Sequence, residues 1–540
     1  MSSALAPASG RGTKLAAVRR RGSALAVAFA VAAFALAGCG GSGGTFHIVA
    51  GSEQKTFEPI VQQFCSDQGV TCTIDYKGSL DIGLMLSEQN APDIDAVWPA
   101  SSLWLDMYDA HRRVKDLKSI ATTPVILGVR MSKARELGWV GKTVRMEDIL
   151  AAVSAGKLTF LMTSATQSNS GASAYLAMLA SAFGQPDRLD PRALDDANAR
   201  EKVKALLKGV VRSSGSSGWL KDLYLAGAKA GRPYDGMWNY EAVLKETNDA
   251  LKGQGGELLY AIYPADGATY ADAPLGYVEH GQDKSTHDFF DKLQAHMLSA
   301  DVQAQIAQSG RRTAPGMARP APAEPEWNFN PSKVVTSIAL PEPKVIGRAL
   351  LLYQEVLRRP SLTAICLDFS GSMQGEGEKQ VQAAMGTLFD PQAASRSLIQ
   401  WTPNDRIMLL PFDASVRDVA QGDGTSPSQA RLLQWVGTQH ADGGTDMYAC
   451  AERALTEMKP YLDSGQYLAA VVIMTDGRSD AHDGFADAWR REGHDVPIFG
   501  VTFGDADKSQ LDELADLTRA RVFDGRDNLT EAFRSVRGYN

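Results

Sequence analysis

The chain has 540 residues, a net charge of -8 and 44% hydrophobic residues. This composition excludes wholesale disorder, and the acidic balance excludes the basic surface of a nucleic-acid-binding protein, so we expect no nucleic-acid partner. The length predicts two or more domains.

The first 38 residues have the pattern of a secretory signal. Several arginines and a lysine precede an uncharged apolar stretch over 24–36, which is too short to span a bilayer. The stretch leads into Leu-Ala-Gly-Cys, which ends at Cys39 and resembles the lipobox of bacterial lipoproteins. That resemblance implies cleavage before Cys39, a diacylglycerol on its thiol, and a flexible Gly-rich tether over 39–44. We therefore expect a lipid anchor in the cell membrane, with the chain on the extracytoplasmic face; the alternative is an ordinary secretory signal with a chance cysteine.

Four cysteines remain once Cys39 is set aside. Cys65 and Cys72 flank a short turn, which predicts a local disulfide in an oxidising compartment. Cys366 and Cys450 either pair or stay as two buried thiols, and the sequence leaves both readings open. No Cys-x-x-Cys or Cys/His cluster occurs, so a zinc site is not expected.

Residues 45–317 alternate predicted strands with helices. The strands are expected at 45–50, 70–76, 94–98 and 159–162. Each strand is followed by a loop with small hydroxyl residues, and such loops at helix amino-termini suit anions or polar ligands. The candidate ligand-binding residues are Ser52, Ser79, Ser168 and Ser170. Serines also cap helices in proteins without any ligand, and that reading stays open for each of the four.

This order of strands and loops resembles a type II periplasmic solute-binding protein. The resemblance implies a bilobed α/β domain that binds a small polar solute in a cleft between lobes joined by hinge strands. Glu53, Trp98 and Trp238 could instead favour a cationic or sugar-like ligand, and the sequence does not decide between these classes.

Residues 318–360 separate this unit from the next. The stretch begins rich in proline and ends in an amphipathic segment over 345–358, which predicts a linker followed by a helix.

Residues 361–540 contain apolar runs separated by helical patterns. These runs predict strands at 362–367, 406–412, 469–475, 497–503 and 521–523. The pattern is typical of an α/β fold with a doubly wound, Rossmann-like parallel sheet.

Oxygen-bearing side chains follow two of these strands and lie in one further loop. They are Asp368, Ser370 and Ser372 in a D-x-S-x-S pattern, Thr445 in Gly-Gly-Thr-Asp, and Asp476 in Thr-Asp-Gly. Loops at the carboxyl ends of parallel strands meet at one edge of the sheet, and hard divalent cations prefer such oxygen ligands. Helix capping alone would explain one of these segments but not all three in order.

The three segments resemble the metal-ion-dependent adhesion site of von Willebrand factor A domains. The resemblance implies that Ser370, Ser372 and Thr445 contact the metal, whereas Asp368 and Asp476 hold it largely through water. The expected ion is Mg²⁺ or another divalent cation such as Mn²⁺ or Ca²⁺. A partner protein would add an Asp or Glu carboxylate at the open position.

No sequence pattern supports catalysis. None of the eight histidines lies in a Ser-His-Asp or His-Glu-x-x-His context, and no Gly-x-x-x-x-Gly-Lys loop occurs, so we do not expect an enzyme. The resulting hypothesis is a lipid-anchored, extracytoplasmic binding protein that engages a protein through the metal and a small polar ligand through the cleft. The alternative is the solute receptor of an ABC-type transporter.

Overall fold

The computed structural model describes residues 44–88, 93–184, 189–313, 316–396, 398–476, 478–479, 484–492, 494–502, 508–526 and 529–538. The expected signal peptide and Cys39 lie outside the described residues, as does all of the expected tether except Gly44. Residues from Gly43 onward form one compact unit. Within the described ranges, no helix combines the length and the apolar character that a bilayer crossing needs.

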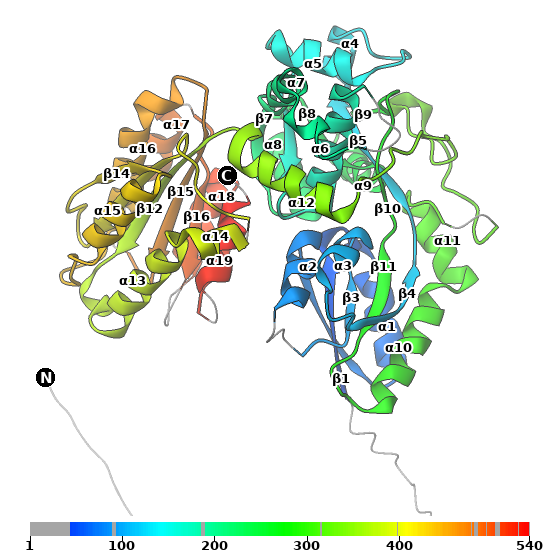
Figure 1. The fold of residues 1–540 in the computed structure, drawn as a ribbon, viewed down its shortest axis with the longest axis horizontal. Coiled ribbons are helices and arrows are strands. Elements are labelled where there is room, and N and C mark those ends of the chain that lie inside the picture. The colour runs from blue at the N-terminus through cyan, green and yellow to red at the C-terminus, as the bar shows by residue number, and fades with distance from the viewer. Residues whose placement is uncertain are drawn as a thin grey trace, which may run out of the picture. The chain divides into compact units, whose positions relative to one another are not determined.

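The first lobe is built on a five-stranded sheet of order β2-β1-β3-β11-β4 (Figure 1). Its strands are β1 (Thr45–Gly51), β2 (Thr71–Lys77), β3 (Ala96–Trp98), β4 (Val114–Ser119) and β11 (Pro274–Val278). Strand β1 pairs in parallel with β2 and β3, whereas β11 runs antiparallel to β3 and β4. The helices of this lobe are α1 (Glu58–Asp67), α2 (Ser79–Ser87), α3 (Leu103–Tyr108), α10 (Lys284–Met297) and α11 (Ala300–Gln308).

The second lobe has its own sheet of order β10-β5-β8-β6-β7, with β9 also paired to β5. Its strands are β5 (Thr123–Arg130), β6 (Phe160–Thr163), β7 (Val210–Ser214), β8 (Gly236–Tyr240), β9 (Leu259–Ile262) and β10 (Tyr270–Ala271). Its helices are α4 (Met131–Glu136), α5 (Met146–Ser154), α6 (Asn169–Ala182), α7 (Ala197–Leu207), α8 (Ser217–Lys229) and α9 (Glu241–Gly253). Strand β5 is almost wholly buried, as expected for a strand covered on both faces.

The chain passes between the two lobes three times, from β4 into β5, from β10 into β11, and from α11 into the segment that contains Trp327 and Phe329. This arrangement confirms the predicted bilobed α/β domain. The strands expected at 45–50, 70–76, 94–98 and 159–162 correspond to β1, β2, β3 and β6, each displaced by no more than two residues at either end.

The proline-rich segment that follows α11 of the first lobe packs against the second lobe. Trp327 and Phe329 are buried and stack with ring centroids 4.8 Å apart, and both belong to the apolar core that contains β8 and β9. Helix α12 (Pro343–Leu352) then buries Ile346 and Ala349 against the same lobe, where the Tyr175 hydroxyl donates to the carbonyl of Ala349 at 2.8 Å. The segment between the domains is therefore fixed to the second lobe by its aromatic and aliphatic side chains.

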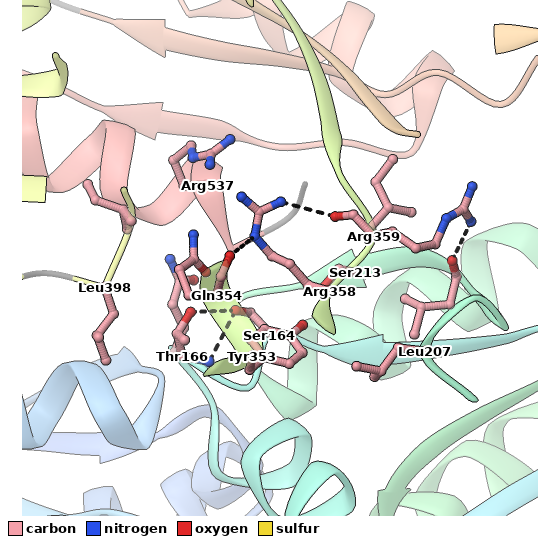
Figure 2. A pocket seen from close by; sticks show the side chains of 14 residues that line it. Ser164, Thr166, Leu207, Ser213, Tyr353, Gln354, Arg358, Arg359, Leu398 and Arg537 are labelled. Atoms are coloured by element: carbon pink, nitrogen blue, oxygen red, sulfur yellow. Dashed lines mark hydrogen bonds between the residues drawn. The ribbon is translucent and has the colours of Figure 1, made fainter. Parts of the chain in front are cut away.

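A π-helical turn, Tyr353–Leu357, follows α12 and ends at Arg358. The Arg358 guanidinium donates to the carbonyls of Gln354 and Arg359, as Figure 2 shows. It also forms a two-pronged ion pair with buried Asp405, with contacts of 3.0 and 2.6 Å. Burial by itself raises the pKa of Asp405, but the charges of Arg358 and Arg537 outweigh it and lower that pKa to about 2. The start of the last domain is thus held by a buried carboxylate with two cationic neighbours.

The carboxyl-terminal domain has a six-stranded sheet of order β14-β13-β12-β15-β16-β17. Its strands are β12 (Ser361–Asp368), β13 (Arg406–Phe412), β14 (Ala420–Asp423), β15 (Leu468–Thr475), β16 (Ile498–Thr502) and β17 (Val522–Asp524). Its helices are α13 (Glu376–Leu388), α14 (Pro391–Arg396), α15 (Ser426–Val436), α16 (Met447–Leu462), α17 (Phe485–Glu492), α18 (Ser509–Thr518) and α19 (Leu529–Arg537). Two separate apolar cores cover the two faces of the sheet.

This topology confirms the predicted doubly wound sheet, since β12, β13, β15, β16 and β17 are all parallel to their neighbours in that set. Strand β14 was not predicted. It is a short antiparallel edge strand with the sequence Ala-Gln-Gly-Asp, which contains no apolar run that could reveal it.

Two disulfides tie these elements together. Cys65 at the end of α1 joins Cys72 in β2, over a separation of 7 residues. Cys366 in β12 joins Cys450 in α16, over a separation of 84 residues. The second bond resolves the alternative that the sequence left open, and it fixes α16 against the strand that carries Asp368.

Candidate metal centre and ligand cleft

The D-x-S-x-S segment begins on the last residue of β12 and continues into a short 3₁₀ helix, Gly371–Met373. A buried strand thereby delivers Asp368 to the carboxyl edge of the sheet, while Ser372 lies on the exposed side of the turn. The Gly371 N–H donates to the carbonyl of Gly443 at 3.0 Å, and a Cβ on Gly371 would lie 3.1 Å from that oxygen. The two predicted loops therefore meet backbone to backbone.

Four of the five predicted metal residues form one chain of polar contacts. The Asp368 carboxylate accepts the Ser370 N–H at 2.8 Å. The Ser370 and Ser372 hydroxyl oxygens lie 3.1 Å apart. The Ser372 hydroxyl in turn donates to the Asp476 carboxylate at 2.9 Å. Residues more than 100 positions apart in the sequence are thus brought together at one edge of the sheet.

Thr445, the fifth predicted residue, lies in the loop that reaches this edge from the amino-terminal end of α16. Gly443 has a φ of 84°, a backbone conformation that favours glycine and turns the chain sharply. The loop is held by Asp446, whose N–H donates to the Asp413 carbonyl at 2.7 Å and whose carboxylate caps α16 at the Ala449 N–H. Thr445 is half-buried beside this cap.

Asp368 is fully buried, and burial raises the pKa of its carboxyl above the ordinary range. The charge of Asp476 raises this pKa further, whereas hydrogen bonds from Ser370 and Thr475 lower it. A cation placed among these oxygens would favour the ionised form of Asp368 and remove the repulsion between the two carboxylates.

The donor set fits a hard divalent cation. It offers three hydroxyls and two carboxylates, and the described residues contain no group of three or more His, Cys, Asp and Glu side chains placed to hold a metal. Oxygen-only donors suit Mg²⁺, Mn²⁺ or Ca²⁺ and do not suit zinc or copper.

Sequence reasoning missed two residues that shape this centre. The Thr475 hydroxyl donates to the buried Asp368 carboxylate at 2.5 Å. Arg417 pairs with Asp413 at 2.8 Å, and its guanidinium donates to the carbonyls of Phe369 and Asp442 at 3.1 and 3.0 Å. Thr475 could have been suspected because it precedes Asp476, but no motif marks Arg417.

In the amino-terminal domain, the strand-end loops of the two lobes touch each other. The Ser52 hydroxyl of the first lobe accepts the Gly218 N–H of the second at 2.8 Å. The Leu80 N–H donates to the Gln167 carbonyl at 3.1 Å. A Cβ on Gly78 would lie 2.3 Å from that same carbonyl oxygen, so only glycine allows this approach. The structure is therefore the closed form of the bilobed domain.

All four serines predicted to bind a ligand are buried at or beside this contact. Ser79 accepts the Ala100 N–H at 2.9 Å within the first lobe. Ser168 and Ser170 both lie against Ser217, with oxygen separations of 3.3 and 2.8 Å. In the closed form their hydroxyls, like that of Ser52, bond to the protein itself.

A small cavity of about 10 Å³ remains between the lobes, lined by Glu53, Gln54 and Arg311 among others. One water fills a space of this size. Burial raises the pKa of Glu53 to about 7, and the Oε1 atoms of Glu53 and Gln54 have no hydrogen-bond partner among the described residues. The Gln54 oxygen is an acceptor, and the Glu53 carboxyl accepts when it is ionised and can donate when it is protonated. A water or hydroxyl group would satisfy both, and an ammonium group would satisfy the ionised form.

Comparison with known families divides the chain in the same way as the fold does. Residues 47–312 match the family model of bacterial extracellular solute-binding proteins. Residues 363–521 match that of the von Willebrand factor type A domain. No relative was found among curated proteins.

Solved structures with a similar fold cover each part. The periplasmic binding protein AfuA from Actinobacillus pleuropneumoniae is 12% identical over 52% of this chain and 88% of that chain, with a TM-score of 0.39. The ferric binding protein from Campylobacter jejuni is 17% identical over 57% and 98%, with a TM-score of 0.39. A von Willebrand factor type A protein from Catenulispora acidiphila is 21% identical over 34% and 42%, with a TM-score of 0.28, so the match spans less than half of that chain. A solute-binding domain followed by a von Willebrand factor A domain fits an extracytoplasmic binding protein.

Proposed function

We propose that this chain is a lipid-anchored, extracytoplasmic binding protein that grips a protein partner through a divalent cation. Cys39 carries the lipid, and Asp368, Ser370, Ser372, Thr445 and Asp476 hold the cation. The observation that carries the proposal is the chain of contacts from the buried Asp368 through two hydroxyls to Asp476.

The mixture of donors determines what the cation can do. Three of the five residues are neutral hydroxyls, so a bound divalent ion keeps part of its positive charge and offers it to an additional carboxylate. Ser372 is exposed and Asp476 half-buried, which leaves this side of the centre open to a partner. An Asp or Glu side chain of a partner protein is the matching group.

The cleft domain adds a second binding function, for a small polar solute. In the closed form the lobes touch through Ser52 and Gly218, so a solute has to enter while the lobes are apart. The unpaired Glu53 and Gln54 oxygens favour a solute that presents hydroxyl or ammonium donors.

A transport receptor is the second candidate. The match of residues 47–312 to extracellular solute-binding proteins favours it, since two lobes joined by crossing segments suit capture and release of a solute. A solute receptor alone would have no use for the metal centre, and this favours the adhesion reading.

Immobilised peptides that differ only in carrying Asp or Glu in place of Asn or Gln would test the adhesion proposal. We expect the full-length protein to bind the acidic set in Mg²⁺ and to leave it in EDTA. Equal binding to the acidic and the amide peptides that also persists in EDTA would refute the metal bridge. Thermal shifts with sugars, amines and oxyanions address the cleft separately, because a ligand that prefers the folded domain raises its melting temperature.

A further inference from the structure

The last helix of the carboxyl-terminal domain contacts both lobes of the solute-binding domain. One face of α19 is anchored in its own domain, where Ala532, Phe533 and Val536 are buried in the core on one side of the sheet. Arg537 of α19 also bonds to Ser361 in its own domain, whereas other contacts of α19 and of Gly538, which follows it, are with residues more than 300 positions earlier in the chain.

On the first lobe, α19 holds Asp81 in the first turn of α2. The Arg534 guanidinium forms an ion pair with the Asp81 carboxylate, and the two side chains are only 8% and 11% exposed. Removing one partner of such a buried pair leaves the other charge without compensation, so the pair resists separation.

On the second lobe, α19 holds the loop before α6 and the end of β7. The Gln167 side chain donates to the carbonyl of Arg534 at 2.5 Å, and the Ser213 hydroxyl donates to the carbonyl of Gly538 at 3.1 Å. A Cβ on Gly538 would lie 1.5 Å from the Gln167 Oε1 atom, so a larger residue at this position would force the Gln167 side chain to move.

Gln167 belongs to both contacts at once. Its side chain bonds to α19, and its backbone carbonyl accepts the Leu80 N–H of the first lobe. Asp81, which pairs with Arg534, is the next residue after Leu80. The point where the two lobes touch and the point where α19 docks are therefore the same few residues.

We propose that α19 is an intramolecular latch that fastens the two lobes in the closed form. Arg534 binds the first lobe through its side chain and the second through its carbonyl. The cleft can then open only when the carboxyl-terminal domain releases Asp81 or Gln167. Access to the cleft is thereby coupled to the position of the other domain. The inference depends on neither the metal nor the identity of a solute.

Hydrogen exchange of backbone amides in the full-length protein would test this latch. The reporters are the Gly218 and Leu80 amides, which are bonded across the lobes. We expect Arg534→Gln to accelerate their exchange by about tenfold or more, because the closed form loses a buried ion pair. Arg526→Gln removes a comparable but exposed pair with Asp524 and should leave both amides unchanged.

A double-mutant cycle separates the latch from a local effect on α2. Asp81→Asn should accelerate exchange like Arg534→Gln, and the double variant should be little faster than either single one. Gly538→Ala gives an independent result, since it leaves both charges in place and disturbs only the contact with Gln167. Unchanged exchange at both amides in folded Arg534→Gln and Gly538→Ala, or fully additive effects in the cycle, would overturn the proposal. If Arg534→Gln does not fold, Gly538→Ala and Asp81→Asn decide by the same criterion.

Discussion

The proposed metal-site loops of the carboxyl-terminal domain and the cleft loops of the amino-terminal domain have similar sequences and positions. They differ in the groups to which their hydroxyls bond. Both place serines and threonines just beyond parallel strands that end at one edge of a sheet. In the carboxyl-terminal domain two carboxylates stand among the hydroxyls, and Ser372 points to Asp476 on an open side. In the cleft, Ser170 and Ser217 bond to each other, and Ser52 accepts an N–H of the opposite lobe. Hydroxyls among carboxylates offer the donors of the proposed cation site, whereas hydroxyls that face another lobe fasten the two lobes together.

The largest expected difference between the two regions concerns their disulfides. The stabilisation from a disulfide grows with the loop it closes, and the separations of 84 and 7 residues correspond to about 4.5 and about 2.5 kcal/mol. Replacing Cys366 and Cys450 by Ala should therefore destabilise the domain that carries them more than replacing Cys65 and Cys72 destabilises theirs. Urea unfolding followed by peptide-resolved hydrogen exchange measures the loss of stability in each domain. Equal losses would contradict this ranking.

The cleft should lose stability as the pH rises, because of Glu53. Burial raises the pKa of Glu53 from 4.5 to about 7, so between these values the folded domain keeps a proton that the unfolded chain has released. Stability of the amino-terminal domain should fall through this range by about 3 kcal/mol and then level off above pH 7. Glu53→Gln should flatten the profile, whereas Glu279→Gln, at an exposed carboxylate of the same lobe, should not. A profile that keeps its slope in Glu53→Gln would assign the effect to another group.

Mg²⁺ binding should require Asp476, whereas folding of the carboxyl-terminal domain should not. Asp476 is half-buried and bonds to the exposed Ser372, so Asp476→Asn removes a charge next to the ion at little cost to packing. We expect Mg²⁺ affinity to fall by about a hundredfold while the melting temperature without metal stays unchanged. Asp487→Asn, at an exposed carboxylate on α17, is the matched control. Calorimetric titration gives the Mg²⁺ affinity of each variant. An unaltered affinity in Asp476→Asn would mean that Asp476 does not help to hold the ion.

Two serine substitutions test the difference between the two regions at the level of single hydroxyls. Ser170→Ala deletes a buried hydroxyl that bonds to Thr163 and Ser217, and it should cost about 1 kcal/mol of stability with no effect on the metal. Ser372→Ala should do the reverse, weakening metal binding with a stability change within about 0.5 kcal/mol. Chemical denaturation and metal titration of both variants test this. Equal changes in stability and in metal affinity in the two variants would mean that the two hydroxyls play the same role.

Much of the carboxyl-terminal domain could be predicted because its signals are local. Each parallel strand is an apolar run, and the carboxyl ends of parallel strands share one edge, so Asp368, Ser370 and Asp476 could be placed together from their positions alone. The role of Arg417 could not be predicted, because it depends on hydrogen bonds to the carbonyls of Phe369 and Asp442, which are 48 and 25 residues away. Contacts of that kind depend on the fold and leave no pattern around the arginine.

The cleft shows the opposite case. Several strands could be predicted from apolar runs, and the two lobes from the resemblance to periplasmic solute-binding proteins. The partners of Ser52, Ser79, Ser168 and Ser170, however, depend on which loop faces them. The proline-rich segment is a further example. Its composition predicts a linker, yet Trp327 and Phe329 bury their rings against the second lobe. The composition of this segment predicts its conformation in isolation, but whether its aromatic rings are buried depends on the surface of the second lobe.

Titration of the full-length protein with Mn²⁺, followed by calorimetry, is the most direct test of the proposed metal centre. We expect one saturable ion per chain in the native protein and no saturable binding in the double variant Asp368→Asn/Asp476→Asn, with both proteins folded. Native-like binding in that folded double variant, or no binding to the native chain, would contradict a metal centre at this edge of the sheet.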